Sequence, residues 1–215
     1  MKELCEARWP KKGDNPFQVK DGDHMLPTWI SLGWLASMQP NETVYAEAFK
    51  EAGDKLVDAL FQEDNKLPSD IYFMPITYLY RHSLEIKLKE IIKLGLRLDL
   101  IEEDDKVSEA MKKHGLHKLW NHARRVIDAH WPPSDMPKSA KVDVDNAGKI
   151  ILEFHKIDMT GQNLRYPEDR KGNPTLKGMP EAVELTQIKD VFEAAYNFLN
   201  GCDSGLIEAI DVMSY

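Results

Sequence analysis

The stretch FMPITYLYRHSLEIKLKEIIKLG, residues 73–95, decides the fold. Apolar residues recur along it every three or four positions, which is the period of one face of a helix. The stretch follows the breaker sequence LPSD, in which Ser69 or Asp70 can cap a helix. We therefore predict a helix that begins at this cap and ends near Leu98. It is the longest apolar helix of the sequence and should be central in the fold.

Helical patterns continue on both sides of this stretch. Apolar periodicity predicts helices at 43–63, 115–131, 140–157 and 182–200. Asn41 or Thr43 can cap the first of these helices, and Pro132 and Pro133 end the second. Two segments stay open: the acidic segment at 101–113 is either a loop with a short helix or one solvated helix, and the tail after residue 200 is either helical or irregular.

The order of these elements predicts an all-α, antiparallel helical bundle, because strand patterns are weak throughout. Residues 1–42 are broken by prolines and predict an irregular N-terminal arm, which Trp9, Trp29 and Trp34 attach to the body. Residues 43–215 form the helical domain. Before its last main helix, residues 159–180 are rich in Gly, Pro, Asn and Asp and predict a long ordered loop, in which a small hairpin is an option.

Composition limits the class of protein. The chain has 215 residues, of which 42% are apolar and 30% charged, as in an ordinary globular protein with one core. A net charge of -8 argues against non-specific coating of nucleic acid, although local basic patches remain. Two cysteines, Cys5 and Cys202, fit reduced thiols better than a disulfide scaffold. Without a signal peptide or an apolar run long enough to span a membrane, we expect a cytoplasmic protein.

A polar triplet interrupts the central apolar stretch. Arg81 and Glu85 are four residues apart and His82 and Glu85 are three apart, so the three side chains share one edge of the helix. They can simply pair with each other on the helix surface. At the edge of a core, however, they would need partners from elsewhere in the chain, because an unpaired buried charge is costly.

Two segments can supply such partners. His114 and His117 stand at the start of the helix predicted at 115–131, where backbone donors favour anions. Arg165 lies in the extended loop sequence LRYP and could hold a phosphate, or could instead pair with Glu85 or an acidic helix end.

Other chemistries find little support in the sequence. His82, Glu85, His114 and His117 are competent metal ligands, but H-x-x-E and H-x-x-H are weak patterns and we predict no metal and no cofactor. Motifs for a nucleophilic serine, a phosphate loop or a dinucleotide site are missing from the sequence.

A third polar cluster, Arg124, Arg125 and His130, lies in the helix predicted at 115–131. It could bind RNA phosphate, since an arginine and a histidine suffice for metal-independent cleavage, or it could be a solvated basic helix end.

The sequence resembles the HEPN-like families, small all-helical domains of prokaryotic conflict systems. The resemblance spans roughly residues 43–200 and rests on YLYRHSLEIKLKEII, HGLHKLWNHA and LRYPEDRKG, in that order. Arg81, His82, Glu85, His114 and Arg165 match the polar positions of an uncharacterised branch with an R-H-x-x-E helix and an R-Y-P loop. Arg125 and His130 have the R-x4-H spacing of ribonuclease members, with Val126 after the arginine.

The resemblance implies a homodimer that acts on or binds RNA in a defence or toxin–antitoxin setting. If it is a metal-independent ribonuclease, Arg81 and Arg165 would hold the phosphate, His82 would transfer the proton and Glu85 would orient one of them. The alternative is a non-catalytic interaction module for a partner protein or a nucleotide, in which Arg81, Glu85 and Arg165 form a buried structural network.

Overall fold

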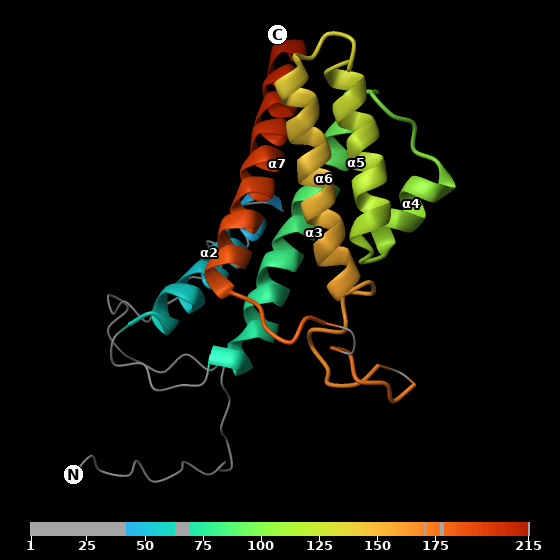
Figure 1. The fold of residues 1–215 in the computed structure, drawn as a ribbon. Coiled ribbons are helices and arrows are strands. Elements are labelled where there is room, and N and C mark those ends of the chain that lie inside the picture. The colour runs from blue at the N-terminus through green and yellow to red at the C-terminus, as the bar shows by residue number, and fades with distance from the viewer. Residues whose placement is uncertain (1–41, 63–68, 170, 177–178, 215) are drawn as a thin grey trace, which may run out of the picture. The chain divides into compact units, whose positions relative to one another are not determined.

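The computed structural model describes residues 42–62, 69–169, 171–176 and 179–214. The helices are α2 (Glu42–Leu60), α3 (Phe73–Arg97), α4 (Asp105–Lys112), α5 (Leu116–His130), α6 (Lys138–Ile157) and α7 (Leu185–Met213), and a 3₁₀ turn at Ser69–Tyr72 precedes α3. In these ranges the structure has helices and loops but no strand, which confirms the predicted all-α bundle (Figure 1). Of the predicted arm, residues 1–42, only Glu42 belongs to the described residues; Cys5 and the three tryptophans lie outside them.

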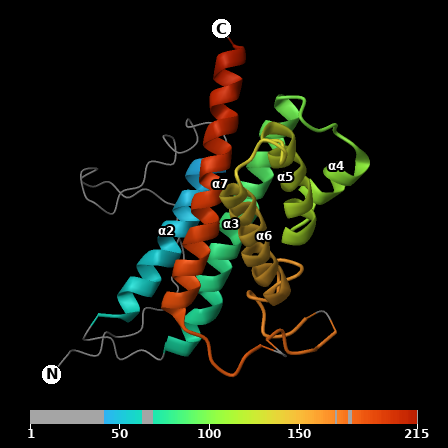
Figure 2. The same cartoon turned by 45° about the horizontal axis from the view of Figure 1, so that its top comes forward.

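Helix α3 is central, as its sequence predicts. It contacts α2, α5, α6 and α7. Three pairs of helices run antiparallel: α2 and α3, α5 and α6, and α6 and α7 (Figures 1 and 2). Helices α3 and α5 run parallel, because the segment containing α4 leads the chain back toward the N-terminal half of α3. The start of α5 therefore lies beside the first half of α3, where the polar triplet is.

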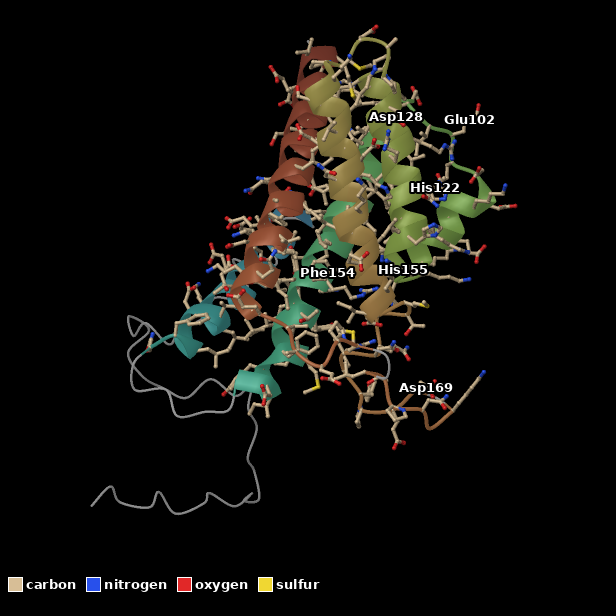
Figure 3. The ribbon with its side chains drawn as sticks, viewed as in Figure 1. Glu102, His122, Asp128, Phe154, His155 and Asp169 are labelled. Carbon is tan, nitrogen blue, oxygen red and sulfur yellow. The ribbon has the colours of Figure 1, made fainter. Side chains whose placement is uncertain are left out.

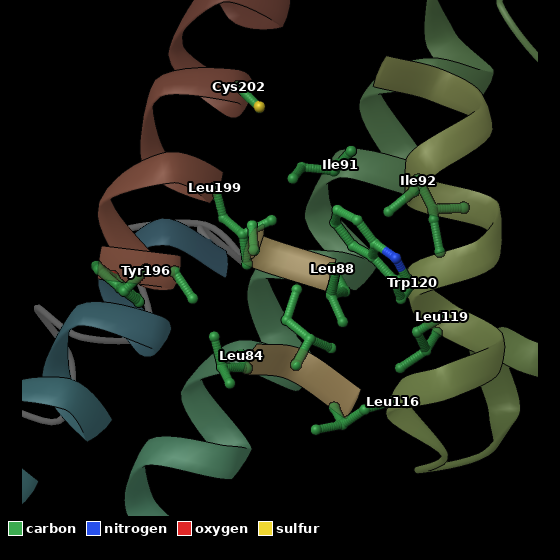
Figure 4. Close-up of a cluster of buried hydrophobic side chains, with 14 of the residues drawn as sticks. Leu84, Leu88, Ile91, Ile92, Leu116, Leu119, Trp120, Tyr196, Leu199 and Cys202 are labelled. Carbon is green, nitrogen blue, oxygen red and sulfur yellow. The ribbon is translucent and has the colours of Figure 1, made fainter. Parts of the chain in front are cut away.

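The core lies where α3, α5, α6 and α7 meet (Figure 4), and α2 and α4 each add two buried residues to it. Helix α3 buries one apolar face along its whole length, and the facing side chains come from α5 and α7. The members from these three helices include Leu84, Leu88, Ile91, Ile92, Leu116, Leu119, Trp120, Tyr196 and Leu199.

Local sequence explains where the helices begin and end. Pro75 lies in the first turn of α3, where a missing N–H costs little. Asp99 ends α3 in the left-handed conformation with φ 54°, a position that short polar residues tolerate. Asp104 caps α4 by accepting a hydrogen bond from the backbone N–H of Val107 at 2.8 Å.

Helix α7 differs most from its predicted range. It begins at Leu185 and continues without a break to Met213, so the tail after residue 200 is helical. Gly205 lies inside this helix. A Cβ at this position would be 2.7 Å from Cζ2 of Trp131, so a side chain does not fit there. Gly205 thus permits close packing of α7 against Trp131.

The described part of the loop between α6 and α7 includes a short turn closed by a bridge. An antiparallel bridge joins Glu168 and Pro174, and Gly172 has φ 79° in the turn between them. The Asp169 carboxylate accepts hydrogen bonds from the backbone N–H groups of Lys171 and Asn173 at 2.7 and 2.9 Å. Among the described residues, no helix is long and apolar enough to cross a membrane.

Candidate functional site

Arg81 is the best-connected side chain of the polar triplet. It is 1% exposed. Its Nη1 donates to Oε2 of Glu85 at 3.0 Å, its Nε donates to the backbone carbonyl of Asp158 at 3.1 Å, and its Nη2 donates to the backbone carbonyl of His114. One guanidinium thus connects α3 to the segment before α5 and to the end of α6. All three of its nitrogens are occupied within the protein.

Glu85 is the acceptor at the centre of this arrangement. Its Oε1 accepts hydrogen bonds from Nζ of Lys89 and from Nδ1 of His114, each at 2.8 Å. Burial alone would raise the pKa of Glu85, but the hydrogen bonds from Lys89, His114 and Arg81 outweigh burial and lower this pKa to about 2. Glu85 is therefore ionised at neutral pH and is a poor proton donor.

Asp158 fixes the loop that follows α6. Its Oδ1 accepts hydrogen bonds from the backbone N–H groups of Gln162 and Asn163 at 2.8 and 3.0 Å. Its Oδ2 is buried and lies 3.5 Å from Nε of Arg81. The carboxylate therefore faces Arg81 with one oxygen and binds the backbone of the following loop with the other.

Gly161 allows the loop to approach closely. Its φ is 75°, and a Cβ at this position would lie 2.7 Å from Cβ of His114. Together these contacts hold α3, the start of α5 and the loop after α6 at one end of the bundle. We call this set the Arg81 network; it consists of the buried residues Arg81, Glu85 and Asp158 and the exposed His114.

His82 points to a different environment from its two polar neighbours. Its ring stacks on Tyr78 with centroids 5.7 Å apart and meets the edge of Phe49 at 4.4 Å. Burial is the main cause that lowers the pKa of His82, and the Arg81 charge acts in the same direction. The imidazole is therefore neutral at pH 7 and can accept a proton.

Arg165 contacts Tyr78, the ring on which His82 stacks, and its contacts among the described residues do not include Glu85. Its guanidinium carbon is 5.8 Å from the centroid of the Tyr78 ring and 5.9 Å from that of Tyr166. Arg165 is exposed, and the Tyr166 side chain is 58% exposed. Tyr78, His82, Arg165 and Tyr166 thus form a continuous patch, which we call the Tyr78–Arg165 surface.

His117 and His155 form a pair beside the Arg81 network. Their ring centroids are 5.8 Å apart, and Figure 3 shows His155 on α6. Burial lowers the pKa of His155, and the charges of His117 and Arg81 lower it further. His117 is exposed and contacts neither Arg81 nor Glu85 among the contacts of the described residues.

The predicted cluster on α5 is divided among three positions, and Figure 3 labels Asp128 and His122, the partners of Arg124 and Arg125. Arg124 pairs with Asp128 at 2.8 Å and with Asp145 of α6 at 3.0 Å, so its charge is neutralised. Arg125 lies 3.4 Å from Nδ1 of His122. His130 packs at the far end of α5, where its ring meets the edge of Trp131 at 4.3 Å.

A second buried ionic cluster is one that sequence reasoning missed. Lys87 is fully buried and donates to Asp203 of α7, and its Nζ lies 3.4 Å from Oε2 of Glu90. Oε1 of Glu90 accepts from Thr43 at 2.6 Å. Burial raises the pKa of Glu90. The only signal in the sequence is the pair Lys87 and Glu90 within an apolar helix, and nothing local indicates Asp203.

Of the residues predicted to act together, Arg81, Glu85 and His114 do meet, whereas His82 and Arg165 each contact Tyr78 in the adjacent patch. The additional members are Lys89, Asp158, Tyr78 and Tyr166. Lys89 follows Glu85 by four residues and could have been found from this spacing. Asp158 comes from a distant helix end, for which a single sequence carries no signal.

Neither a metal site nor a known relative identifies this constellation. Within the described ranges, no group of three or more His, Cys, Asp or Glu side chains is arranged to hold a metal ion. No family model, curated protein or solved structure matches the chain.

Proposed function

We propose that this chain is an HEPN-like protein of a prokaryotic defence or toxin–antitoxin system that binds single-stranded RNA on the Tyr78–Arg165 surface. The observation that carries the proposal is the position of Arg165, whose guanidinium faces both the Tyr78 and the Tyr166 rings, while the half-buried ring of His82 stacks on Tyr78. The exposed ring of Tyr166 and the partly exposed ring of Tyr78 next to an arginine provide stacking positions for unpaired bases and a contact for phosphate.

The scarcity of positive charge on the Tyr78–Arg165 surface indicates that base stacking is the main source of RNA affinity. The chain has a net charge of -8, and Arg165 is the cation of the Tyr78–Arg165 surface. Because one phosphate contact on a single strand changes log Kobs by about -0.7 per unit of log salt concentration, we expect a shallow salt dependence near this value. A basic groove that tracks the RNA backbone would give a much steeper slope.

Two residues predicted to be catalytic have a structural role in this proposal. Arg81 and Glu85 are occupied by the Arg81 network, so we assign them to holding the surface in place and not to contacting a phosphate. His82 and Arg165 remain as the residues that can touch RNA. If cleavage occurs, His82 is the group that accepts the proton of the 2′-hydroxyl, because its lowered pKa leaves it neutral.

The test is a titration of a fluorescent single-stranded oligouridylate, followed by anisotropy, with the corresponding duplex as competitor. Tyr166→Ala should weaken binding by about ten-fold, since stacking on one aromatic side chain contributes roughly 1–3 kcal/mol per base. Tyr45→Ala, which removes a tyrosine of similar exposure on α2, is the matched control and should bind as the wild type does. A wild-type protein without saturable RNA binding would refute the proposal.

Cleavage is measured in the same samples. We expect any cleavage to persist with chelator and to be lost in His82→Ala. Cleavage that needs a divalent ion, or that persists in His82→Ala, would exclude the role given to this histidine.

The second candidate is a non-catalytic interaction module for a protein partner or a nucleotide. The hydrogen bonds of Arg81 favour this second candidate, since a guanidinium with every nitrogen occupied within the protein is structural. A homodimer stays a prediction under either candidate and is checked by the molar mass in solution.

A further inference from the structure

A second site lies at the end of the bundle where α5 ends and α6 begins, beside the middle of α7 (Figure 1). It is a cavity of about 640 Å³, which we call the Trp131 cavity. This volume is within the range of sites that hold a small organic molecule. The apolar side chains of its walls come from α5, the segment after it, α6 and α7: Ile127, Trp131, Met136, Ala140, Val144 and Phe198.

The rim of the Trp131 cavity is negatively charged. Asp135 and Asp143 line it and are exposed, and none of the described residues that line it is a lysine or an arginine. Asp135 accepts a hydrogen bond from the Ser134 hydroxyl at 2.9 Å, and Asp143 has no hydrogen bond or ion pair in the described part of the chain. By contrast, Asp145 on the same helix pairs with Arg124 at 3.0 Å. The two carboxylates at the cavity therefore keep their charge without a cation.

The interior of the Trp131 cavity combines aromatic rings with an uncharged thiol. Trp131 and Phe198 contribute the rings, and aromatic faces attract organic cations. Cys202 of α7 lines the cavity and is 7% exposed (Figure 4). Burial raises the pKa of its thiol to about 12, so the thiol is uncharged at neutral pH and acts as a soft apolar group. A ligand that enters from the rim therefore meets carboxylates first and an apolar, aromatic interior next.

The geometry points to a binding site for a small organic amine, in which a protonated ammonium group is attached to an apolar body. The body fills the interior of the Trp131 cavity, and the ammonium group lies at the rim, where Asp135 and Asp143 supply the opposite charge. An organic acid of the same shape would place its charge beside two carboxylates. The Tyr78–Arg165 surface plays no part in this inference, which is independent of the proposed RNA binding.

Three probes with the same apolar body and different charges test the inference. The probes are 3-phenylpropylamine, which is a cation at pH 7, the neutral 3-phenylpropan-1-ol and the anion 3-phenylpropionate. Binding is measured by NMR titration of the full chain. We expect the amine to bind about two- to five-fold more tightly than the alcohol, the worth of one exposed ion pair. The carboxylate probe should bind more weakly than the alcohol, because it meets like charges at the rim.

A double variant should abolish the preference for the amine. Asp135→Asn combined with Asp143→Asn keeps the shape of both side chains and removes both charges, so the amine and the alcohol should bind equally. The matched control is Asp190→Asn combined with Asp211→Asn. These two exposed aspartates of α7 do not line the Trp131 cavity, and their replacement changes the net charge by the same amount. The control should keep the wild-type preference for the amine.

Two further variants locate the probe in the Trp131 cavity. Gly201 of α7 lines the cavity, and a Cβ there would meet nothing within 4 Å, so Gly201→Trp fills the space without displacing the helix. Ala140→Trp fills the cavity from α6. Both variants should lose binding of the amine while their circular dichroism spectra show that the helices persist. The inference is overturned by amine binding that survives both variants, by a preference that survives the double aspartate variant, by tighter binding of the alcohol or the carboxylate probe, or by no saturable binding of the amine to the wild type.

Discussion

Arg81 and Glu85 lie one turn apart on α3, joined by a hydrogen-bonded ion pair with Nη1 and Oε2 3.0 Å apart, and both side chains are almost completely buried. A pair at this spacing on an exposed helix would contribute only a few tenths of a kcal/mol. Here each partner also binds groups from distant parts of the chain. The pair therefore connects helices, and its removal leaves buried groups without partners.

Arg81→Met should destabilise the protein by about 3–5 kcal/mol, because it leaves the Glu85 carboxylate and two backbone carbonyls in the interior without their donor. Arg97→Met, an exposed arginine in the last turn of the same helix, should change stability by less than about 0.5 kcal/mol. Urea denaturation of both variants measures the difference. Equal stability of the two variants would show that the Arg81 network contributes nothing to folding.

Acid should remove the contribution of the Glu85 carboxylate to the free energy of unfolding. Its pKa of about 2 in the folded chain lies below the ordinary value of 4.5, so its contribution is complete above pH 4.5 and is lost as the pH falls from 4.5 through 2. A pKa difference of this size corresponds to about 3 kcal/mol. Glu85→Gln should therefore be less stable than the wild type at pH 7 and should approach it near pH 2.

Denaturation of the two proteins between pH 2 and 7 measures this convergence. Glu51→Gln, at an exposed ion pair on α2, is the control and should follow the wild type at every pH. A stability difference between Glu85→Gln and the wild type that is independent of pH would contradict the account of the Glu85 charge.

The helices could be predicted because their signals are local. The apolar period of residues 73–95 identifies α3, and Pro132 and Pro133 after the end of α5 stop that helix. The 3₁₀ turn before α3 and the continuation of α7 through Gly205 depend on packing partners such as Trp131, which the local pattern does not contain.

The site could be predicted in part for the same reason. Arg81, His82 and Glu85 stand out because polar residues interrupt an apolar helix. Their separation into two groups depends on Asp158, whose carbonyl accepts a hydrogen bond from Arg81, and on Tyr78, on which His82 stacks. A single sequence gives the spacing along one helix but not the direction in which distant segments return to it.

Lys87 and Asp203 offer a test of buried charge in the second cluster. Both are buried and in direct contact. Lys87→Met should cost about 3–5 kcal/mol because it leaves Asp203 and Glu90 as neighbouring buried acids, whereas Lys87→Met combined with Asp203→Leu should recover most of this loss. A double-mutant cycle by urea denaturation measures the coupling. Additive effects would mean that the two charges do not interact.

Two helical glycines should respond to alanine in opposite directions. A Cβ at Gly148 of α6 would lie 2.7 Å from Nε1 of Trp120, so Gly148→Ala forces α5 and α6 apart and should cost about 1–3 kcal/mol. A Cβ at Gly201 of α7 would meet nothing within 4 Å, so Gly201→Ala should stabilise the protein by about 0.5–1 kcal/mol. Thermal unfolding of both variants checks the two signs, and a loss of stability in Gly201→Ala would contradict the open position of this residue on α7.

The central claim is that RNA contacts the Tyr78–Arg165 surface, and photocrosslinking locates such a contact directly. A uridine-rich single-stranded RNA is bound to the full chain and irradiated, and the crosslinked peptides are identified by mass spectrometry. We expect crosslinks at Tyr78, His82 or Tyr166 and their loss when Arg165→Ala weakens binding. Crosslinks confined to α5 around Arg125, or to no residue at all, would contradict it.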